Sequence, residues 1–261
     1  MAKMAALPLL LLVLGQATAA DLPEAIEAYL RHAGFTWNCE AGGHFQFCWE
    51  ASLASNANMA TARSAAESDR EQVLAMMNLP PVYEPRIYVF FVASPRRMKE
   101  LIGYEGEGRS RPAQHAVFFV PTPIRPSLRH ELTHEILTNL WGAAEAWIEE
   151  GMATFVAYSG QVSARSVTMT EDGVMLPLGN LVREEWNPAM YPLEVTYDEL
   201  AGFVEYLIRK YGLERVKAIW QGGSESIPKV TEKTVRALEA DWRAELERAA
   251  AARGKPHEQG G

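Results

Sequence analysis

The chain has 261 residues, with 25 Lys and Arg against 33 Asp and Glu, and a formal net charge of -8. Its 48% hydrophobic and 22% charged residues are typical of a globular protein and exclude a disordered one. The acidic excess argues against nucleic-acid binding, which needs a basic face. Two cysteines are too few for a small fold built on disulfides or for a Cys₄ zinc site.

The first 20 residues have the features of a secretory signal peptide. Lys3 supplies a positive charge, residues 7–14 (LPLLLLVL) form a short apolar run, and small residues follow at 17–20 (ATAA). The run is shorter than the roughly 20 residues that cross a bilayer, although an uncleaved N-terminal anchor is the alternative. We therefore expect a periplasmic or secreted protein with a signal peptide (1–20), one folded domain (21–250), a disordered tail (251–261) and no membrane span after cleavage.

The two cysteines are predicted to close a hairpin. Cys39 and Cys48 flank the sequence EAGGHFQF, in which Gly42-Gly43 is a turn signal. An oxidising compartment would let them form a disulfide, worth about 2–3 kcal/mol in a loop of this length. A metal or redox pair is the rival interpretation, but the spacing is not CxxC and no histidine cluster lies nearby.

The remaining pattern predicts an α+β fold, with a small mixed sheet before a mainly helical half. We expect helices at 22–32, 51–77 and 95–102, and a hairpin from 35–37 and 44–49. Residues 86–93 (RIYVFFVA) predict a central strand covered on both faces, and residues 115–120 (HAVFFV) a second strand after a loop at 104–112. From residue 126 we expect helices, including apolar stripes at 200–207 and 235–246, except for a polar stretch at 159–192 with a hairpin turning at 171–173.

The sequence HELTH at 130–134 is an HExxH motif within a predicted helix. On a helix, His130 and His134 lie one turn apart on the same face, where two imidazoles can hold one Zn²⁺. Glu131 would then act as general base toward a zinc-activated water. Chance occurrence is the competing explanation, expected in roughly 1–2% of shuffled sequences, and the helical context argues against it.

A catalytic zinc usually has a third protein ligand. The metzincin pattern does not fit, because Leu137 and Leu140 stand where it needs Gly and His. A glutamate on the next helix, within AWIEEGMATF after a break at Gly142, is the remaining option. HELTH followed by AWIEEGMATF resembles the gluzincin metallopeptidases, especially the peptidase MA-like domains of exported bacterial proteins.

The resemblance implies a zincin-like fold with the HExxH helix at the junction of sheet and helices. It implies that Glu150, directly before Gly151, is the third zinc ligand. Glu149 would lie about 100° further round the helix, so we expect it to be solvated. The resemblance also implies that Tyr197, opening a later helix, donates a hydrogen bond to the developing oxyanion, although Leu200 stands where related enzymes have Gly. Core packing is the alternative role for Tyr197.

Further expectations concern the surroundings of the motif and the other histidines. Thr154 stands where many gluzincins have an acidic residue that orients a zinc-bound histidine, and Asn139 is a possible substitute. HAVFFV would form the sheet edge that pairs with a substrate peptide, with a buried central strand as the rival. His44 and His115 are expected to be ordinary polar residues on strands, and His257 in the tail is a weak metal candidate.

Together these observations predict an exported zinc metallopeptidase that acts on a peptide or protein substrate. A non-catalytic zinc-binding or assembly protein is one alternative, although such a protein usually loses the base that Glu131 supplies. A metallohydrolase acting on non-peptide amides, such as cell-wall bonds, is another. The sequence does not determine the substrate, the choice between endo- and exopeptidase action, or the oligomeric state.

Overall fold

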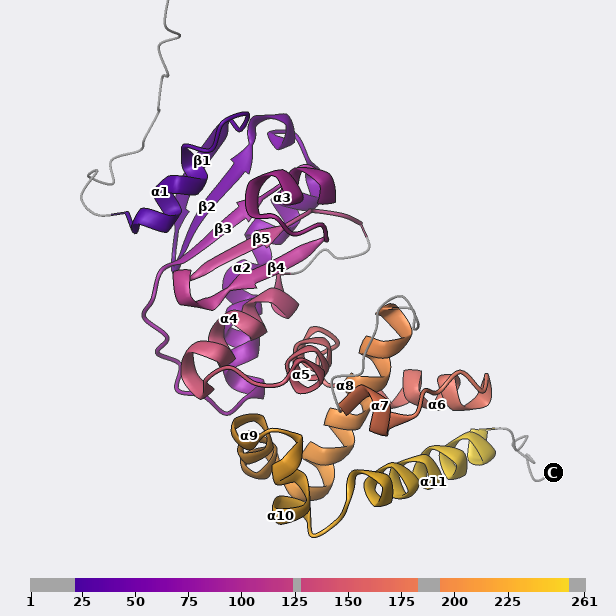
Figure 1. Cartoon of the computed structure of the whole chain (residues 1–261). Helices are drawn as coiled ribbons and strands as arrows, with labels where there is room; N and C mark the ends of the chain where they lie inside the picture. Colours follow the sequence, from indigo (N-terminus) through magenta and orange to yellow (C-terminus); the bar gives the residue numbers. More distant parts are fainter. Residues whose placement is uncertain (1–21, 124–127, 183–192, 254–261) are drawn as a thin grey trace, which may run out of the picture.

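The computed structural model describes residues 22–123, 128–182 and 193–253 (Figure 1). The predicted signal peptide, the predicted helix start at Pro126-Ser127, and His257 lie outside these residues. The last helix continues to Arg253, three residues into the predicted tail.

The described elements follow the predicted order, with strands early and helices late. The strands are β1 (Trp37–Gly42), β2 (Phe45–Glu50), β3 (Ile87–Phe91), β4 (Gly108–Arg111) and β5 (Ala116–Phe119). The helices among and before them are α1 (Glu24–Leu30), α2 (Ala57–Met76) and α3 (Pro95–Ile102). The later helices are α4 (Arg129–Trp141), α5 (Ala146–Ala157), α6 (Ser163–Glu171), α7 (Leu178–Val182), α8 (Leu193–Tyr211), α9 (Leu213–Gly222), α10 (Ile227–Thr231) and α11 (Val235–Arg253).

The five strands form one mixed sheet in the order β1-β2-β3-β5-β4. The pairs at the two edges, β1 with β2 and β4 with β5, are antiparallel, and β2, β3 and β5 run parallel. Alternate side chains of β3 enter two different cores. Val89 and Phe91 face a large core shared with α2 and α4, whereas Phe90 faces a smaller core with α1 and α3. The predicted α+β class and the central strand covered on both faces are therefore confirmed.

Two predictions about the middle of the chain are wrong. Residues 104–112 are not entirely loop, because residues 108–111 form β4 at the sheet edge. HAVFFV is consequently not the sheet edge but the buried strand of the rival interpretation, since β5 lies between β3 and β4. The sequence GRSR of β4 has no apolar alternation, and it becomes a strand only through antiparallel pairing with β5.

The polar stretch at 159–192 is also not a hairpin in its described part. It forms the short helices α6 and α7 (Figure 1). Gly173 has a positive φ of 68°, but it follows the end of α6 and does not join two strands. The buried side chains of Val167 and Met169 attach α6 to the body of the protein, and such packing supplies most of the stability of a short helix.

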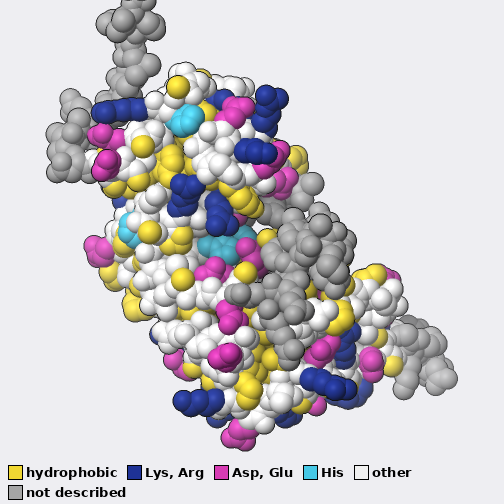
Figure 2. All heavy atoms as spheres, viewed as in Figure 1, with side chains coloured by type: hydrophobic (Ala, Val, Ile, Leu, Met, Phe, Trp, Pro, Cys, Tyr) yellow, Lys and Arg dark blue, Asp and Glu magenta, His cyan; other side chains and the backbone are white. Residues whose placement is uncertain are grey.

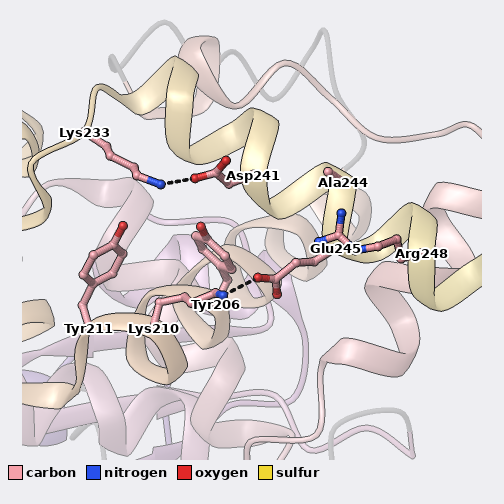
Figure 3. A pocket seen from close by; sticks show the side chains of 8 residues that line it. All are labelled: Tyr206, Lys210, Tyr211, Lys233, Asp241, Ala244, Glu245 and Arg248. Atoms are coloured by element: carbon pink, nitrogen blue, oxygen red, sulfur yellow. Dashed lines mark hydrogen bonds and ion pairs between the residues drawn. The ribbon is translucent and has the colours of Figure 1, made fainter.

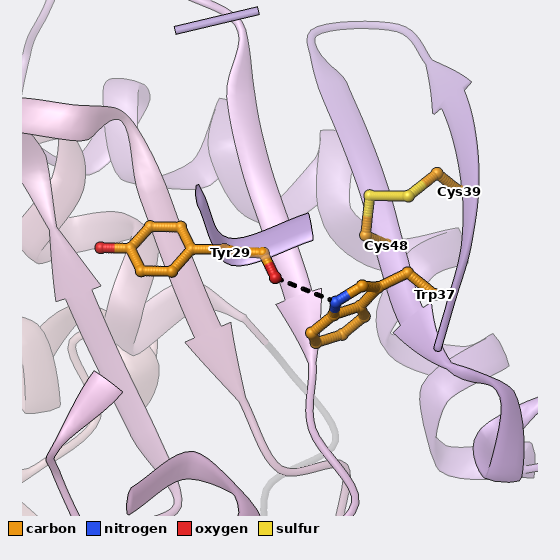
Figure 4. Close-up of a disulfide and its surroundings, with 4 residues drawn as sticks. All are labelled: Tyr29, Trp37, Cys39 and Cys48. Atoms are coloured by element: carbon orange, nitrogen blue, oxygen red, sulfur yellow. Dashed lines mark hydrogen bonds between the residues drawn. A yellow bond between two sulfur atoms is a disulfide. The ribbon is translucent and has the colours of Figure 1, made fainter. Parts of the chain in front are cut away.

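The predicted disulfide is present. Cys39 and Cys48 are direct partners in the β1–β2 register, and their sulfurs are bonded across the hairpin (Figure 4). The first strand of the hairpin covers Trp37–Gly42 and not 35–37, so it begins later and is longer than predicted. The indole of Trp37 donates a hydrogen bond of 3.2 Å to the carbonyl of Tyr29, which connects the hairpin to α1.

The first helix of the second half is fixed by a residue from α2. Asp69 is buried and accepts hydrogen bonds from the backbone N–H of Leu128 (3.1 Å) and from the guanidinium of Arg129. Its carboxylate thus accepts from a backbone N–H that has no partner within α4. Its negative charge also interacts favourably with the positive end of the helix dipole. α4 ends at Gly142, whose φ of 90° breaks the helix where predicted.

The large core continues from the sheet through α4 and α5 to α8 and α11. Gly151 of α5 allows a close approach, because an added Cβ would lie only 2.9 Å from the carbonyl oxygen of Leu200 on α8. α4 and α5 therefore lie between the sheet and the later helices α6 to α11 (Figure 1). None of the helices in the described ranges is long and apolar enough to cross a bilayer.

Candidate metal centre

His130 and His134 project from the same face of α4. Their Nε2 atoms lie 3.2 Å apart, and both side chains are partly exposed. A spacing of four residues on a helix produces this arrangement, because it places the two side chains one turn apart. The imidazoles thus point their donor nitrogens at one small volume.

Glu150 brings a carboxylate from α5 to the same place. Its Oε2 atom lies 3.2 Å from Nε2 of His130 and 3.5 Å from Nε2 of His134. The three ligand atoms all lie within 4.8 Å of one another, so the group could hold a metal ion. Oε2 of Glu150 is buried and has no hydrogen-bond partner in good geometry, and a buried carboxylate oxygen in that state fits a cation at the centre of the group.

The three residues also influence one another's charge. Burial opposes a charge on His134, but the nearby carboxylate of Glu150, together with the charges of Glu131 and Glu149, raises the pKa of the imidazole to about 9. Burial likewise opposes the charge on Glu150, yet its two histidine neighbours lower the pKa of that carboxyl well below its usual range. The centre therefore favours a negative carboxylate next to positive charge.

Glu131 is buried, with 5% of its surface exposed, and lies against the edge strand of the sheet. A Cβ added to Gly108 of β4 would come within 2.7 Å of the Glu131 carboxyl carbon. Only a residue without a side chain leaves room for the carboxylate in this position. Gly108 thus brings the backbone of β4 next to the predicted general base.

The peptide groups of β4 alternate between β5 and the open edge. Val120 donates to the carbonyl of Glu107 at 2.8 Å, so in this register residues 107, 109 and 111 form the hydrogen-bonded pairs with β5. Gly108 and Ser110 consequently direct their N–H and C=O groups outward. Within the described ranges, no backbone partner pairs with these groups. The edge beside Glu131 can therefore accept another extended chain.

Tyr197 lies beside the centre, but not at a helix start. α8 begins at Leu193, so Tyr197 is in its second turn, which corrects the expected position. Its ring is 6.1 Å from the ring of His130, centre to centre, with only 21° between the planes. Three residues further along α8, the backbone of Leu200 packs closely on Gly151 of α5.

The contacts of three polar residues near the ligands bear on the roles expected for them. Glu149 is not simply solvated, because its carboxylate accepts a hydrogen bond of 2.9 Å from Ala144 N and closes the turn before α5. Asn139 donates to Glu135 and to the carbonyl of Pro112, so its described contacts do not reach either ligand histidine. Thr154 is buried, and its hydroxyl has no hydrogen-bond partner among the described residues.

Sequence reasoning missed a buried network behind α4. Glu135 is fully buried and lies 2.8 Å from Nδ1 of His115; Tyr83 donates to it at 3.1 Å, and Asn139 at 3.0 Å. Burial raises the pKa of Glu135 to about 7, and its partners counteract only part of this effect. The signal was available: Glu135 is four residues after Glu131, on a helical face that points inward.

His115 and His44 lie outside the centre. His115 precedes β5 with a left-handed φ of 49° and pairs with Glu135, so it is not simply a polar residue on a strand. His44 lies in the turn before β2, and its Nδ1 is 2.9 Å from Glu67. Neither belongs to the group formed by His130, His134 and Glu150.

A separate cavity of about 360 Å³ lies between the end of α8 and α11 (Figure 3). Two ion pairs line it, Lys210 with Glu245 and Lys233 with Asp241, together with the rings of Tyr206 and Tyr211. Its lining shares no residue with the metal centre. Both of its lysines are paired with carboxylates, and Arg248 also lines it.

Comparison of the sequence with protein-family models and with curated proteins gave no match.

Proposed function

We propose that this protein is an exported zinc-dependent peptidase of gluzincin type. The observation that carries the proposal is the convergence of His130, His134 and Glu150, with Glu131 on the same helix beside them. Two imidazoles and one carboxylate form a His₂Glu ligand set that suits catalytic zinc and leaves a position for water or substrate. When bound, zinc would polarise the substrate carbonyl and favour ionisation of water.

The roles of the protein's own residues follow from their positions. Glu131, held against Gly108, is proposed to take a proton from the attacking water and to deliver it to the leaving amine. Tyr197, stacked beside His130, is proposed to donate a hydrogen bond to the developing oxyanion. Such a donor is worth about 3–4 kcal/mol in the transition state of comparable enzymes.

The proposed substrate is an extended peptide that pairs with β4. Gly108 and Ser110 offer outward N–H and C=O groups next to Glu131, and paired backbones would place a peptide bond beside the base. Export is supported by the sequence of residues 1–20 and is consistent with the disulfide between Cys39 and Cys48.

The test compares the protein lacking residues 1–20 with Glu131→Gln. We expect about one zinc per chain in both, and cleavage of a mixed peptide library only by the parent. Glu171→Gln, at the exposed end of α6, is the matched control and should cleave as the parent does. A folded parent without zinc affinity would refute the metal site. Zinc binding without hydrolysis would favour the assembly protein, and hydrolysis of cell-wall amides alone would favour the other alternative.

A further inference from the structure

The side chains of β4 point alternately to the two faces of the sheet. Ser110 faces α4 and lies 3.4 Å from Glu135, and Gly108 faces Glu131 on the same side. Arg109 and Arg111 must therefore project from the opposite face. Contacts of Arg111 agree with this, since its guanidinium donates to the hydroxyl of Tyr29 (2.6 Å) and to the carbonyl of Ile102 (2.8 Å).

The guanidinium groups of the two arginines differ in their exposure and in their hydrogen bonds. Arg111 is half-buried and held by these hydrogen bonds, whereas Arg109 is exposed. The guanidinium of Arg109 lies 5.2 Å from the centre of the Tyr104 ring, a cation–π contact that restrains the side chain. Among the residues that the structure describes, no carboxylate pairs with Arg109. Basic side chains gather over β4 in Figure 2, next to the histidines in the middle of that face.

The backbone register defines what would lie opposite Arg109. An antiparallel peptide would form hydrogen-bonded pairs with Gly108 and Ser110, whose peptide groups face outward. Its residue between these two pairs would face Arg109 in a non-hydrogen-bonded pair. In such pairs the Cα atoms are only about 4.5 Å apart, and the side chains lie close together on one face.

We propose that Arg109 selects peptide substrates with an acidic side chain at the position opposite it. Because Gly108 touches Glu131, this position lies within about two residues of the cleaved bond. A cross-strand carboxylate would meet a restrained, exposed guanidinium, which is a favourable pair, and a lysine would meet a like charge. The inference rests on the proposed peptidase function. It gives the site a local preference opposite to that expected from the protein's net charge of -8.

The test measures kcat/KM for peptides that carry Glu, Gln or Lys at each position within two residues of the cleaved bond. For the parent, we expect Glu to exceed Lys by roughly tenfold at one position only, with Gln between them. The difference should shrink at 0.5 M salt because the pair is exposed. Arg109→Lys should keep the order of the three peptides, and Arg109→Glu should invert it.

Arg215→Glu provides the control. It makes the same change in charge at an exposed site on α9, so the order of the peptides should remain as in the parent. Thermal unfolding of each variant checks that the fold is retained. If Arg109→Glu cleaves with unchanged preference, the inference is wrong and the peptidase function stands. If the parent cleaves no peptide in a Glu131-dependent manner, the proposed function itself fails.

Discussion

The carboxylate of Glu131 occupies the space that a side chain on residue 108 would need, since a Cβ there would lie 2.7 Å from its carboxyl carbon. The predicted base on α4 therefore packs against a glycine of β4, although the two elements are separated in the sequence. Neither the HExxH motif nor the short segment GRSR reveals this relationship alone.

Gly108→Ala should therefore lower activity without releasing metal. The added methyl group would displace Glu131 from its position, and a displacement of about 1 Å can cost on the order of 100-fold in rate. We expect kcat to fall while zinc content stays near one per chain, measured by atomic absorption. Gly179→Ala on α7, where an added Cβ meets nothing within 4 Å, should leave both unchanged. Equal rates for Gly108→Ala and the parent would contradict the role of this contact.

Substitutions of the adjacent residues Glu149 and Glu150 should have different effects on zinc affinity. Glu150→Gln should weaken zinc binding by more than about 100-fold, because even outer partners of ligands are worth about 10–100-fold. Glu149→Gln should bind zinc like the parent, since its carboxylate accepts from Ala144 N and is not part of the ligand group. Competition with a chromogenic chelator measures both. Comparable loss in the two variants would show that the wrong acid has been assigned.

Tyr83→Phe should destabilise the fold by about 1–3 kcal/mol, because Glu135 would lose a donor in a fully buried setting. Urea denaturation of the metal-free protein gives the change in free energy of unfolding. Tyr88→Phe removes a hydroxyl from another buried tyrosine, for which no hydrogen bond is found within the described ranges. The expectation fails if both variants lose the same stability.

Glu199 should make stability depend on pH. Burial raises its pKa from 4.5 to about 7, although the N–H of Leu176 donates to it at 2.7 Å. Between these values the folded state binds more protons than the unfolded state, so this contribution to stability falls as pH rises from about 4.5 to 7. The total decrease in the free energy of unfolding from this group is roughly 3 kcal/mol.

The side chain in Glu199→Gln is neutral at every pH, so this variant should not lose stability as the pH rises from about 4.5 to 7. We expect its melting temperature to exceed that of the parent at pH 8 and to equal it near pH 4.5. Glu171→Gln, at an exposed site, is the control for removing one charge. A constant difference between Glu199→Gln and the parent across this range would show that Glu199 does not titrate as stated.

The sequence by itself determined the features that depend on neighbours along the chain. His130 and His134 share a face because they are four residues apart on one helix, and Cys39 meets Cys48 because one short turn separates them. The buried strand at 86–93 could be recognised for a related reason, since its side chains are apolar on both faces.

Only the tertiary structure decided the features that depend on packing between distant segments. β4 is a strand because it pairs with β5. The edge of the sheet is therefore formed by GRSR and not by HAVFFV. The resemblance indicated Glu150 as the third ligand, but only the structure shows its carboxylate 3.2 Å from His130 and shows that Glu149 closes the turn before α5. The network around Glu135 likewise joins α4 to residues 83 and 115. Local periodicity carries no information about such contacts, because they are set by how the elements share one core.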